Sequence, residues 1–380
     1  MIRKKSVTRR RFLKAAGVAA GGPLLAAIPS VASGGVLGAN EFLRLAWIGV
    51  GDRGSALLRH AMDCVSSATL KVTGICDIDP AARERAIGKC GAMKPAGSAD
   101  YRELLERSDV DAIFIATPIH LHAEHAVAAL KAGKHVYCEK PLGSTPRDVK
   151  TVYDAVKAAG KKFQVGFQWR YHQGFLALVE AVQAGRAGKP CFVAGQRHVS
   201  AYPTSGWYVD RNLSGDLIVE QAVHEMNVFC WMLKSHPLRA AGIGGINALK
   251  DVPPGRTIMD HYAVTFEFPE AITVAYSHCI YTPQGFGGLY QAVYGTGGRG
   301  VILEDTTRLS VSQDGKRVPV EMPPMRDATE LAILSFVKCI REDQEPLANV
   351  EAGRNATLMA ILGRTAIHER RVAEWSDVAI

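Results

Sequence analysis

The fold is decided by the stretch LAWIGVGDRG at residues 45–54, which leads directly into a segment with helical spacing at residues 55–65. An apolar run that enters a glycine-rich turn and leaves it as a helix is the context that a dinucleotide-binding turn requires. Gly49, Gly51 and Gly54 would let the backbone turn tightly and approach a pyrophosphate at the helix N-terminus. Such a turn can also be purely structural, so its surroundings must decide.

Asp77 supports the cofactor interpretation of this turn. It follows the next apolar run, a little over twenty residues after Gly54. A carboxylate at that place can accept hydrogen bonds from the ribose hydroxyls of NAD, and it repels the extra phosphate of NADP. We therefore predict NAD as the cofactor, bound by a turn that includes Asp52. Arg53, in the same turn, leaves NADP open as an alternative.

Apolar runs alternate with helical segments over the first part of the chain. The runs lie at residues 45–50, 70–76, 112–116, 135–138 and 163–167, and the helical segments at 55–65, 81–89, 124–131 and 147–159. Strands that are apolar on both faces and alternate with helices form a parallel sheet covered on both sides. We predict an N-terminal Rossmann domain, a doubly wound parallel sheet, over residues 40–167.

Residues 168–380 show a different pattern and are predicted to form a second domain. The runs at 262–268 and 272–276 alternate between apolar and polar residues, which is typical of half-exposed antiparallel strands. The segments at 330–341 and 352–371 have helical periodicity and would close the domain.

Most of the net charge lies at the start of the chain. Seven Lys and Arg stand within residues 1–34, which hold no Asp or Glu, leaving +1 of the formal +8 for the rest. A nearly neutral body without a dense basic block does not favour nucleic-acid binding.

Residues 1–34 have the three parts of an export signal. A basic run is followed by an apolar stretch at 15–28 and a small-residue exit at Ser30-Val31-Ala32. The apolar stretch is shorter than the roughly 20 residues of a membrane-spanning helix, so we expect no stable membrane anchor. Residues 8–14, TRRRFLK, resemble a twin-arginine signal. The twin-arginine machinery is therefore a predicted partner, and the predicted location is the periplasm or the exterior, with a tightly bound cofactor carried along in the folded protein.

Two further segments follow predicted strands, where ligands bind in open parallel sheets. The first is Thr117-Pro118 with His122 downstream, and the second is Glu139-Lys140-Pro141. A Lys at such a strand end would lie near the nicotinamide, where its charge can polarise a substrate oxygen. The alternative for Lys140 is a solvated loop lysine.

Together these residues resemble the Gfo/Idh/MocA oxidoreductases, the family of glucose-fructose oxidoreductase and inositol dehydrogenase. The resemblance rests on Gly49 to Gly54, Asp77, Thr117-Pro118 with His122, Glu139-Lys140-Pro141, Gly166-Phe167-Gln168-Trp169-Arg170, and Glu220 with His224. It implies a C-terminal α/β domain with an open, mainly antiparallel sheet that forms the far wall of the active site. It also implies a homo-oligomer through that sheet, and it identifies no substrate.

Glu220 and His224 stand four residues apart, on one face if the segment is a single helix. His224 could then act as a general base that Glu220 orients, and the family pattern of an acidic residue four before the His supports this role. The family usually has Asp at position 220, so the longer Glu220 could instead contact the substrate. Asn227 and Ile119 also depart from residues common in the family.

Aromatic and guanidinium side chains near the predicted pocket suit a sugar, which has apolar faces and polar rims. Arg170, Tyr171 and Tyr208 are the predicted substrate-binding residues, although packing is an alternative for each. The eight Cys form no Cys-x-x-Cys pair and no zinc spacing, so we predict no metal site.

The predicted function is hydride transfer between a sugar or polyol hydroxyl and bound NAD. One alternative is a redox-neutral glycoside hydrolase, which oxidises, eliminates, adds water and reduces again; Tyr171, Tyr208 or Tyr281 could supply its additional base. Another is a binding protein without catalysis, which the presence of both Lys140 and His224 disfavours.

Overall fold

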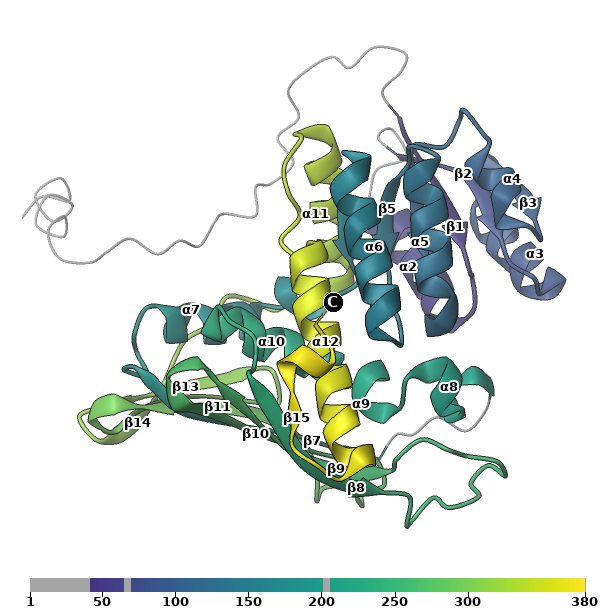
Figure 1. Ribbon diagram of the computed structural model, residues 1–380. Helices are drawn as coiled ribbons and strands as arrows, with labels where there is room; N and C mark the ends of the chain where they lie inside the picture. The colour runs from purple at the N-terminus through teal and green to yellow at the C-terminus, as the bar shows by residue number, and fades with distance from the viewer. Residues whose placement is uncertain (1–41, 65–69, 201–205, 380) are drawn as a thin grey trace, which may run out of the picture. The chain divides into compact units, whose positions relative to one another are not determined.

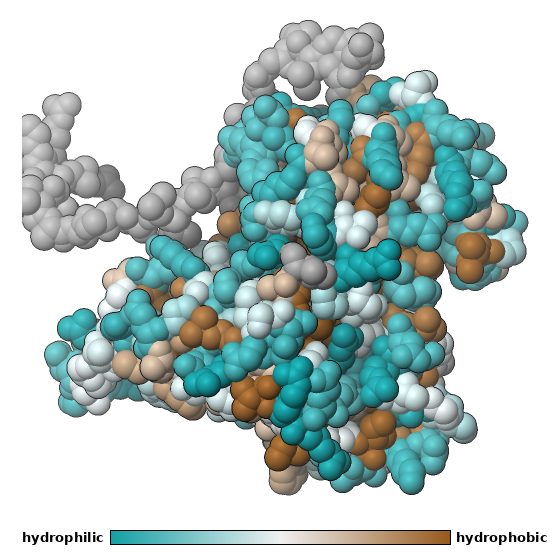
Figure 2. All heavy atoms as spheres, in the orientation of Figure 1, coloured by the Kyte–Doolittle hydropathy of each residue, from teal (hydrophilic) through white to brown (hydrophobic). Residues whose placement is uncertain are grey.

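The computed structural model describes residues 42–64, 70–200 and 206–379. The predicted signal peptide, residues 1–34, lies outside the described residues. Within the described part of the chain, no helix has both the length and the apolar character needed to cross a membrane. The side of the molecule in Figure 2 is mainly hydrophilic, with hydrophobic residues in separate areas.

The first sheet has six strands, all parallel, in the order β3-β2-β1-β4-β5-β6. Their bounds are β1 Leu43–Ile48, β2 Leu70–Cys76, β3 Ala96–Ser98, β4 Ala112–Ile115, β5 His135–Cys138 and β6 Phe163–Val165. The strand order reverses between β1 and β4, which is where ligands bind in doubly wound sheets. The predicted Rossmann sheet is confirmed, and the short β3 is an addition that the apolar pattern did not indicate.

Helices connect these strands and cover the sheet. They are α2 Asp52–Cys64, α3 Pro80–Lys89, α4 Tyr101–Leu105, α5 His122–Lys131 and α6 Pro146–Ala159. Figure 1 shows α5 and α6 packed side by side. Helix α6 begins where its sequence favours it, because Thr145 and Asp148 form a reciprocal capping box around Pro146.

The second sheet has nine strands in the order β14-β13-β12-β11-β7-β10-β9-β8-β15. Their bounds are β7 Pro190–His198, β8 Arg239–Gly245, β9 His261–Phe268, β10 Ile272–Cys279, β11 Gly288–Gly295, β12 Arg299–Glu304, β13 Arg308–Gln313, β14 Lys316–Pro319 and β15 Ala373–Glu374. Only β7 and β10 pair in parallel; every other pairing is antiparallel. The predicted mainly antiparallel C-terminal sheet is confirmed.

The remaining helices pack on the second sheet or link it to the first. They are α7 Gln173–Gln183, α8 Arg211–Ser214, α9 Leu217–Glu220, α10 Val223–Leu233, α11 Ala328–Arg341 and α12 Val350–Glu369. Helix α12 packs against α10, α6 and β8 (Figure 1). The single-turn helices η3, Gln168–Tyr171, and η4, Gly206–Val209, carry residues of the site described below.

Helix α11, from the C-terminal part of the chain, packs against the first sheet. Trp47, Phe114 and Tyr137 stack across β1, β4 and β5, with ring centroids 4.6 and 4.9 Å apart. Phe336 of α11 meets Phe114 and Tyr137 edge-on at 5.6 and 5.7 Å. All four side chains are essentially buried, so residues far apart in sequence build the core beneath the dinucleotide turn.

Candidate active site

The glycine turn after β1 is packed tightly on one side and open on the other. Gly49 has φ +88°, and a Cβ there would lie 2.8 Å from the carbonyl of Ala116 after β4. A Cβ on Gly54 would lie 2.0 Å from the Gly49 carbonyl oxygen. A Cβ on Gly51 would meet nothing within 4 Å. The turn therefore leaves open space at the N-terminus of α2, where a pyrophosphate fits.

Asp77, at the end of β2, is joined to this turn. Its carboxylate accepts hydrogen bonds from the backbone N–H of Val50 at 2.7 Å and of Asp79 at 2.9 Å. The side chain is half-buried, so part of the carboxylate remains accessible. The position fits the ribose contact predicted for it, and Asp77 also holds the turn in place.

His122 links the ends of β4 and β5. Its Nε2 lies 2.8 Å from the Thr117 carbonyl oxygen, and its Nδ1 lies 2.7 Å from the Pro141 carbonyl oxygen. The ring is 1% exposed, and burial lowers its pKa. These contacts favour a positioning role for His122: it holds the loop of Thr117 and Pro118 against the loop of Lys140.

Arg53 is engaged by Glu139 at the end of β5. The Arg53 Nε lies 2.7 Å from Glu139 Oε1, and the other carboxylate oxygen accepts the backbone N–H of Lys140 at 3.3 Å. The end of β5 is three strands from the end of β2, about 14 Å at the usual strand spacing. The Arg53 guanidinium is thus directed away from Asp77 and the ribose position. Its position therefore does not support the alternative in which Arg53 binds the extra phosphate of NADP.

Lys140 and Glu220 meet at the centre of the site. The Lys140 Nζ lies 2.6 Å from Glu220 Oε1 and 2.5 Å from the Glu220 carbonyl oxygen, with the two side chains 14% and 8% exposed. Tyr208 of η4 faces the same carboxylate; burial, together with Glu220, raises the pKa of Tyr208. Of the three predicted substrate-binding residues, Tyr208 is therefore the one that lies beside Lys140.

The predicted orientation of His224 by Glu220 is not what the structure shows. Glu220 ends α9, Gln221 and Ala222 form a turn, and His224 stands in the first turn of α10. The four-residue spacing would place both side chains on one face only in a continuous helix. Because the helix is interrupted, the Glu220 carboxylate turns to Lys140 instead.

His224 lies in an aromatic environment beside this pair. Its ring stacks on Trp169 at 5.0 Å and meets Phe167 edge-on at 6.0 Å. Burial lowers its pKa well below the usual 6.5, and the charges of Lys140 and Arg197 lower it further. His224 is thus neutral at neutral pH and able to accept a proton, and its enclosed Nδ1 has no hydrogen-bond partner among the described residues.

Arg170 and Tyr171 lie within the protein core. Arg170 is 8% exposed, and it donates hydrogen bonds to Asn227 Oδ1 at 2.9 Å and to the Leu347 carbonyl at 3.0 Å. Tyr171 is 5% exposed, and burial raises its pKa to about 12. Other groups of the protein surround both side chains. These surroundings favour a packing role over the predicted contact with substrate.

Sequence reasoning missed Asp216, which starts the segment that carries Glu220. Asp216 is fully buried with φ +81°, a conformation that costs a non-glycine residue about 1–3 kcal/mol. Its carboxylate accepts the N–H groups of Leu217 at 2.7 Å and Met259 at 2.8 Å and pairs with His368 at 2.6 Å. These bonds hold the strained backbone that positions α9. Nothing in residue type or spacing signals this role.

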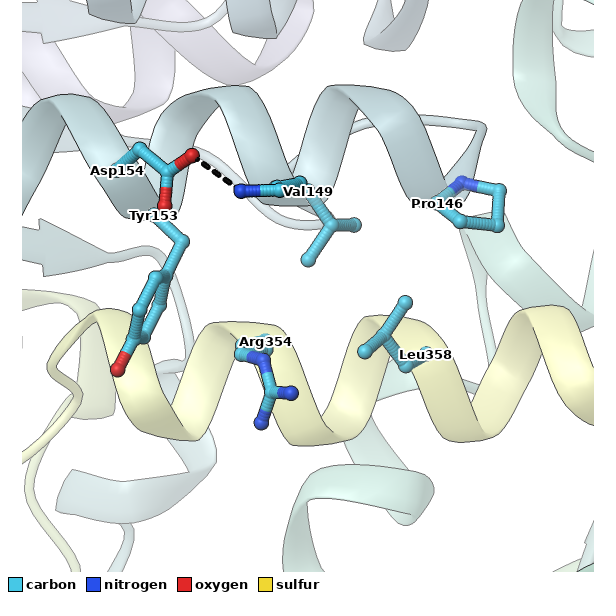
Figure 3. A pocket seen from close by; sticks show the side chains of 7 residues that line it. Pro146, Val149, Tyr153, Asp154, Arg354 and Leu358 are labelled. Atoms are coloured by element: carbon cyan, nitrogen blue, oxygen red, sulfur yellow. Dashed lines mark hydrogen bonds and ion pairs between the residues drawn. The ribbon is translucent and has the colours of Figure 1, made fainter. Parts of the chain in front are cut away.

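A cavity of about 200 Å³ between α6 and α12 lies apart from these residues (Figure 3). Val149 of α6 and Leu358 of α12 face each other across it, and Lys150 pairs with Asp154 at 2.6 Å. Its charged residues lie on both helices, Lys150 and Asp154 on α6 and Arg354 on α12, and the cavity lining does not include Lys140 or Glu220, so we do not assign it a function.

Comparison with known protein families agrees with the fold and the turn. Residues 43–167 match the model of an oxidoreductase family with an NAD-binding Rossmann fold, and residues 175–301 match the Gfo/Idh/MocA C-terminal domain. The chain belongs to the Gfo/Idh/MocA oxidoreductase family.

Three individual proteins illustrate how this chain compares with known sequences and structures. An inositol 2-dehydrogenase of Salmonella paratyphi B is 34% identical over 192 residues, covering 50% of this chain and 54% of that protein. This chain therefore matches only about half the length of that relative. Inositol 2-dehydrogenase 2 of Paenarthrobacter aurescens is 27% identical over 84% of this chain and 94% of that protein. The crystal structure of an aldose-aldose oxidoreductase from Caulobacter crescentus superposes with a TM-score of 0.77 and 19% identity over 88% and 99% of the two chains, which shows a shared fold.

Filling the open side of the turn should remove cofactor binding and leave the fold intact. In Gly51→Leu, the new side chain would enter the space beside the α2 N-terminus, where a Cβ meets no protein atom. We expect the Kd for NADH, measured by fluorescence titration, to rise at least about tenfold, or ~1.4 kcal/mol, with an unchanged Tm. Gly88→Leu, at an exposed glycine of α3 that likewise has open space and no positive φ, controls for the added surface residue. Unchanged NADH binding in Gly51→Leu would contradict the cofactor site.

Proposed function

We propose that this protein is an NAD-dependent oxidoreductase that transfers hydride between a CH–OH carbon of a sugar or polyol and the nicotinamide. The observation that carries the proposal is the Lys140–Glu220 pair at 2.6 Å, which joins the end of β5 to α9 beside the dinucleotide turn. When bound, NAD supplies the hydride acceptor. The protein must supply a group that activates the substrate oxygen and a group that takes its proton.

Lys140 is the group that activates the substrate oxygen. Its ammonium is nearly buried, where a positive charge acts on a neighbouring oxygen more strongly than in water. Glu220 holds the ammonium through both a carboxylate oxygen and its carbonyl oxygen, so the cation is fixed before substrate arrives. An alkoxide that develops on the substrate during hydride loss would be stabilised by this charge.

His224 is the proposed proton acceptor. It is neutral in its enclosed position, and it stands close enough to Lys140 for the ammonium to lower its pKa. Tyr208, beside Glu220, has a hydroxyl group that can also relay a proton or bind a substrate oxygen. That position also supports the second candidate, the redox-neutral glycoside hydrolase, whose elimination step needs an additional base.

A panel of free aldoses, polyols and aryl glycosides separates these activities. Purified protein is mixed with each compound and NAD, and reduced-nicotinamide absorbance and phenol release are recorded together. We expect NADH formation from free sugars or polyols, and a loss of about 10³-fold or more in kcat with Lys140→Met, since a preorganised charge is removed. Phenol release without net NADH would favour the hydrolase. The absence of both NADH formation and phenol release with every compound would contradict the proposed function.

The pH dependence tests His224 as the base. A base with a lowered pKa stays unprotonated as the pH falls, so kcat/KM at saturating NAD should remain level from pH 8 through 6.5 and decline only below that. His224→Asn should lower kcat/KM and remove this acidic decline. A decline centred at or above pH 6.5 that disappears in His224→Asn would contradict the enclosed, neutral histidine.

The same proposal includes export through the twin-arginine route with NAD tightly bound. Its support is the sequence TRRRFLK at residues 8–14 followed by the apolar stretch at 15–28. An exported enzyme would need to regenerate its bound cofactor, for example by passing hydride to a second sugar. Replacing Arg10 and Arg11 by Lys should keep the protein in the cytoplasm, as measured by cell fractionation; unchanged export would contradict this route.

We also propose a homo-oligomer through the outer face of the nine-stranded sheet. Phe192, Ile243 and Tyr294 are 39%, 83% and 51% exposed on the face opposite the helices. An exposed apolar face on a broad sheet is typical of a subunit interface. Ile243→Glu should lower the molar mass measured by light scattering, whereas Val372→Glu, at an exposed residue outside the central strands, should not. A wild-type monomer would contradict the proposal.

A further inference from the structure

A second buried ion pair lies on the sheet side of the site. Arg197 of β7 donates from Nε to Glu225 Oε1 of α10 at 2.6 Å. Glu225 is fully enclosed, whereas the Arg197 side chain keeps 17% of its surface exposed. The carboxylate is therefore a fixed internal support, and the guanidinium reaches from it toward accessible space.

That accessible space adjoins the proposed base. The Arg197 Cζ lies 4.9 Å from the centre of the Trp169 ring, and the same ring stacks on His224 at 5.0 Å. His224 is also the immediate sequence neighbour of Glu225. Arg197 thus belongs to the surroundings of His224, on the wall formed by the second sheet and opposite the dinucleotide turn.

The Arg197 guanidinium has N–H groups that make no hydrogen bond to the described residues. It carries five N–H groups in a rigid fork, and the hydrogen bonds among the described residues use only the one at Nε. The four N–H groups on Nη1 and Nη2 can donate to oxygens of a ligand. The hydroxyl and ring oxygens of a sugar are acceptors of this kind.

The three cations that lower the pKa of His224 each pair with a carboxylate. Arg53 pairs with Glu139 at 2.7 Å, in the same way as Lys140 with Glu220 and Arg197 with Glu225. The three carboxylate side chains are only 6%, 8% and 0% exposed. An anionic substrate that approached one of these cations would be repelled by the enclosed carboxylate paired with it, because charges are screened poorly in a nearly dry site. An uncharged substrate meets no such opposition.

We propose that Arg197 is a substrate-binding residue, and that Glu225 holds it as a neutral pair which selects uncharged sugars and polyols over aldonates, uronates and sugar phosphates. The inference rests on the proposed oxidoreductase function and adds the substrate class. Glu225 acts through Arg197 and is a positioning residue, whose removal should change substrate preference and not only rate.

Glu225→Gln tests the selection directly, since it removes the negative charge and keeps the size and an oxygen that can accept the Arg197 N–H. The neutral sugar that reacts best is compared with its uronate, for example glucose with glucuronate. We expect the ratio of kcat/KM for the acid to kcat/KM for the neutral sugar to rise about tenfold or more. Glu267→Gln, in an exposed pair with Arg239, makes the same change in charge far from the site and should leave the ratio unchanged.

Arg197→Met combined with Glu225→Gln removes both charges together and avoids a buried unpaired carboxylate. This double variant should raise KM for the neutral sugar about tenfold or more, with an unchanged Kd for NADH as evidence of a folded cofactor site. It also decides the matter if Glu225→Gln does not fold. An unchanged KM in the double variant, or an unchanged ratio in folded Glu225→Gln, would overturn the inference while leaving the oxidoreductase intact. A wild type that oxidises no sugar would overturn the proposed function and the inference with it.

Discussion

The ion pair between Lys140 and Glu220 is the contact on which the arrangement of the site depends. It joins residues 80 positions apart, one at the end of a parallel strand and one on a four-residue helix. Both charges are nearly removed from water, so each relies on the other and on further hydrogen bonds. Lys140 donates one to the Glu220 carbonyl oxygen, and Glu220 is positioned by the strained Asp216 at the start of α9, whose carboxylate accepts backbone hydrogen bonds from Leu217 and Met259.

A nearly dry site makes these positions chemically useful. Cations in bulk water polarise an oxygen weakly, whereas an enclosed ammonium acts on it more strongly and without first shedding solvent. The same enclosure lowers the pKa of His224, which keeps the imidazole neutral beside three cations. Arg53, Lys140 and Arg197 each pair with one nearly buried carboxylate.

Local patterns predicted the first half of the molecule well. The apolar runs and glycines around Gly49 and Gly54 have one common structural solution, because the backbone contacts made there exclude any larger residue. The alternating runs of the second domain likewise predicted antiparallel strands. Missing from the prediction were the return of α11 to the first sheet and the aromatic contacts of Phe336, since no local signal links residues so far apart.

Prediction of the site was less complete, for a physical reason that Glu220 illustrates. Its four-residue spacing from His224 assumed one helix, and a two-residue turn at Gln221 redirects the carboxylate to Lys140. Arg170 and Tyr171 were assigned to the pocket by their chemistry, but their partners lie in the core. Arg197 and Glu225 were overlooked because a strand residue and a helix residue become a pair only through tertiary packing.

The most direct test of the account follows the hydride itself. The protein is incubated with NAD and a polyol, such as inositol, that is deuterated at every carbon, and the reduced cofactor is examined by mass spectrometry and NMR. The account predicts one deuterium at C4 of the nicotinamide in the wild type and essentially none with Lys140→Met under the same conditions. Reduced cofactor without deuterium, or equal transfer in the two proteins, would contradict the central role of Lys140.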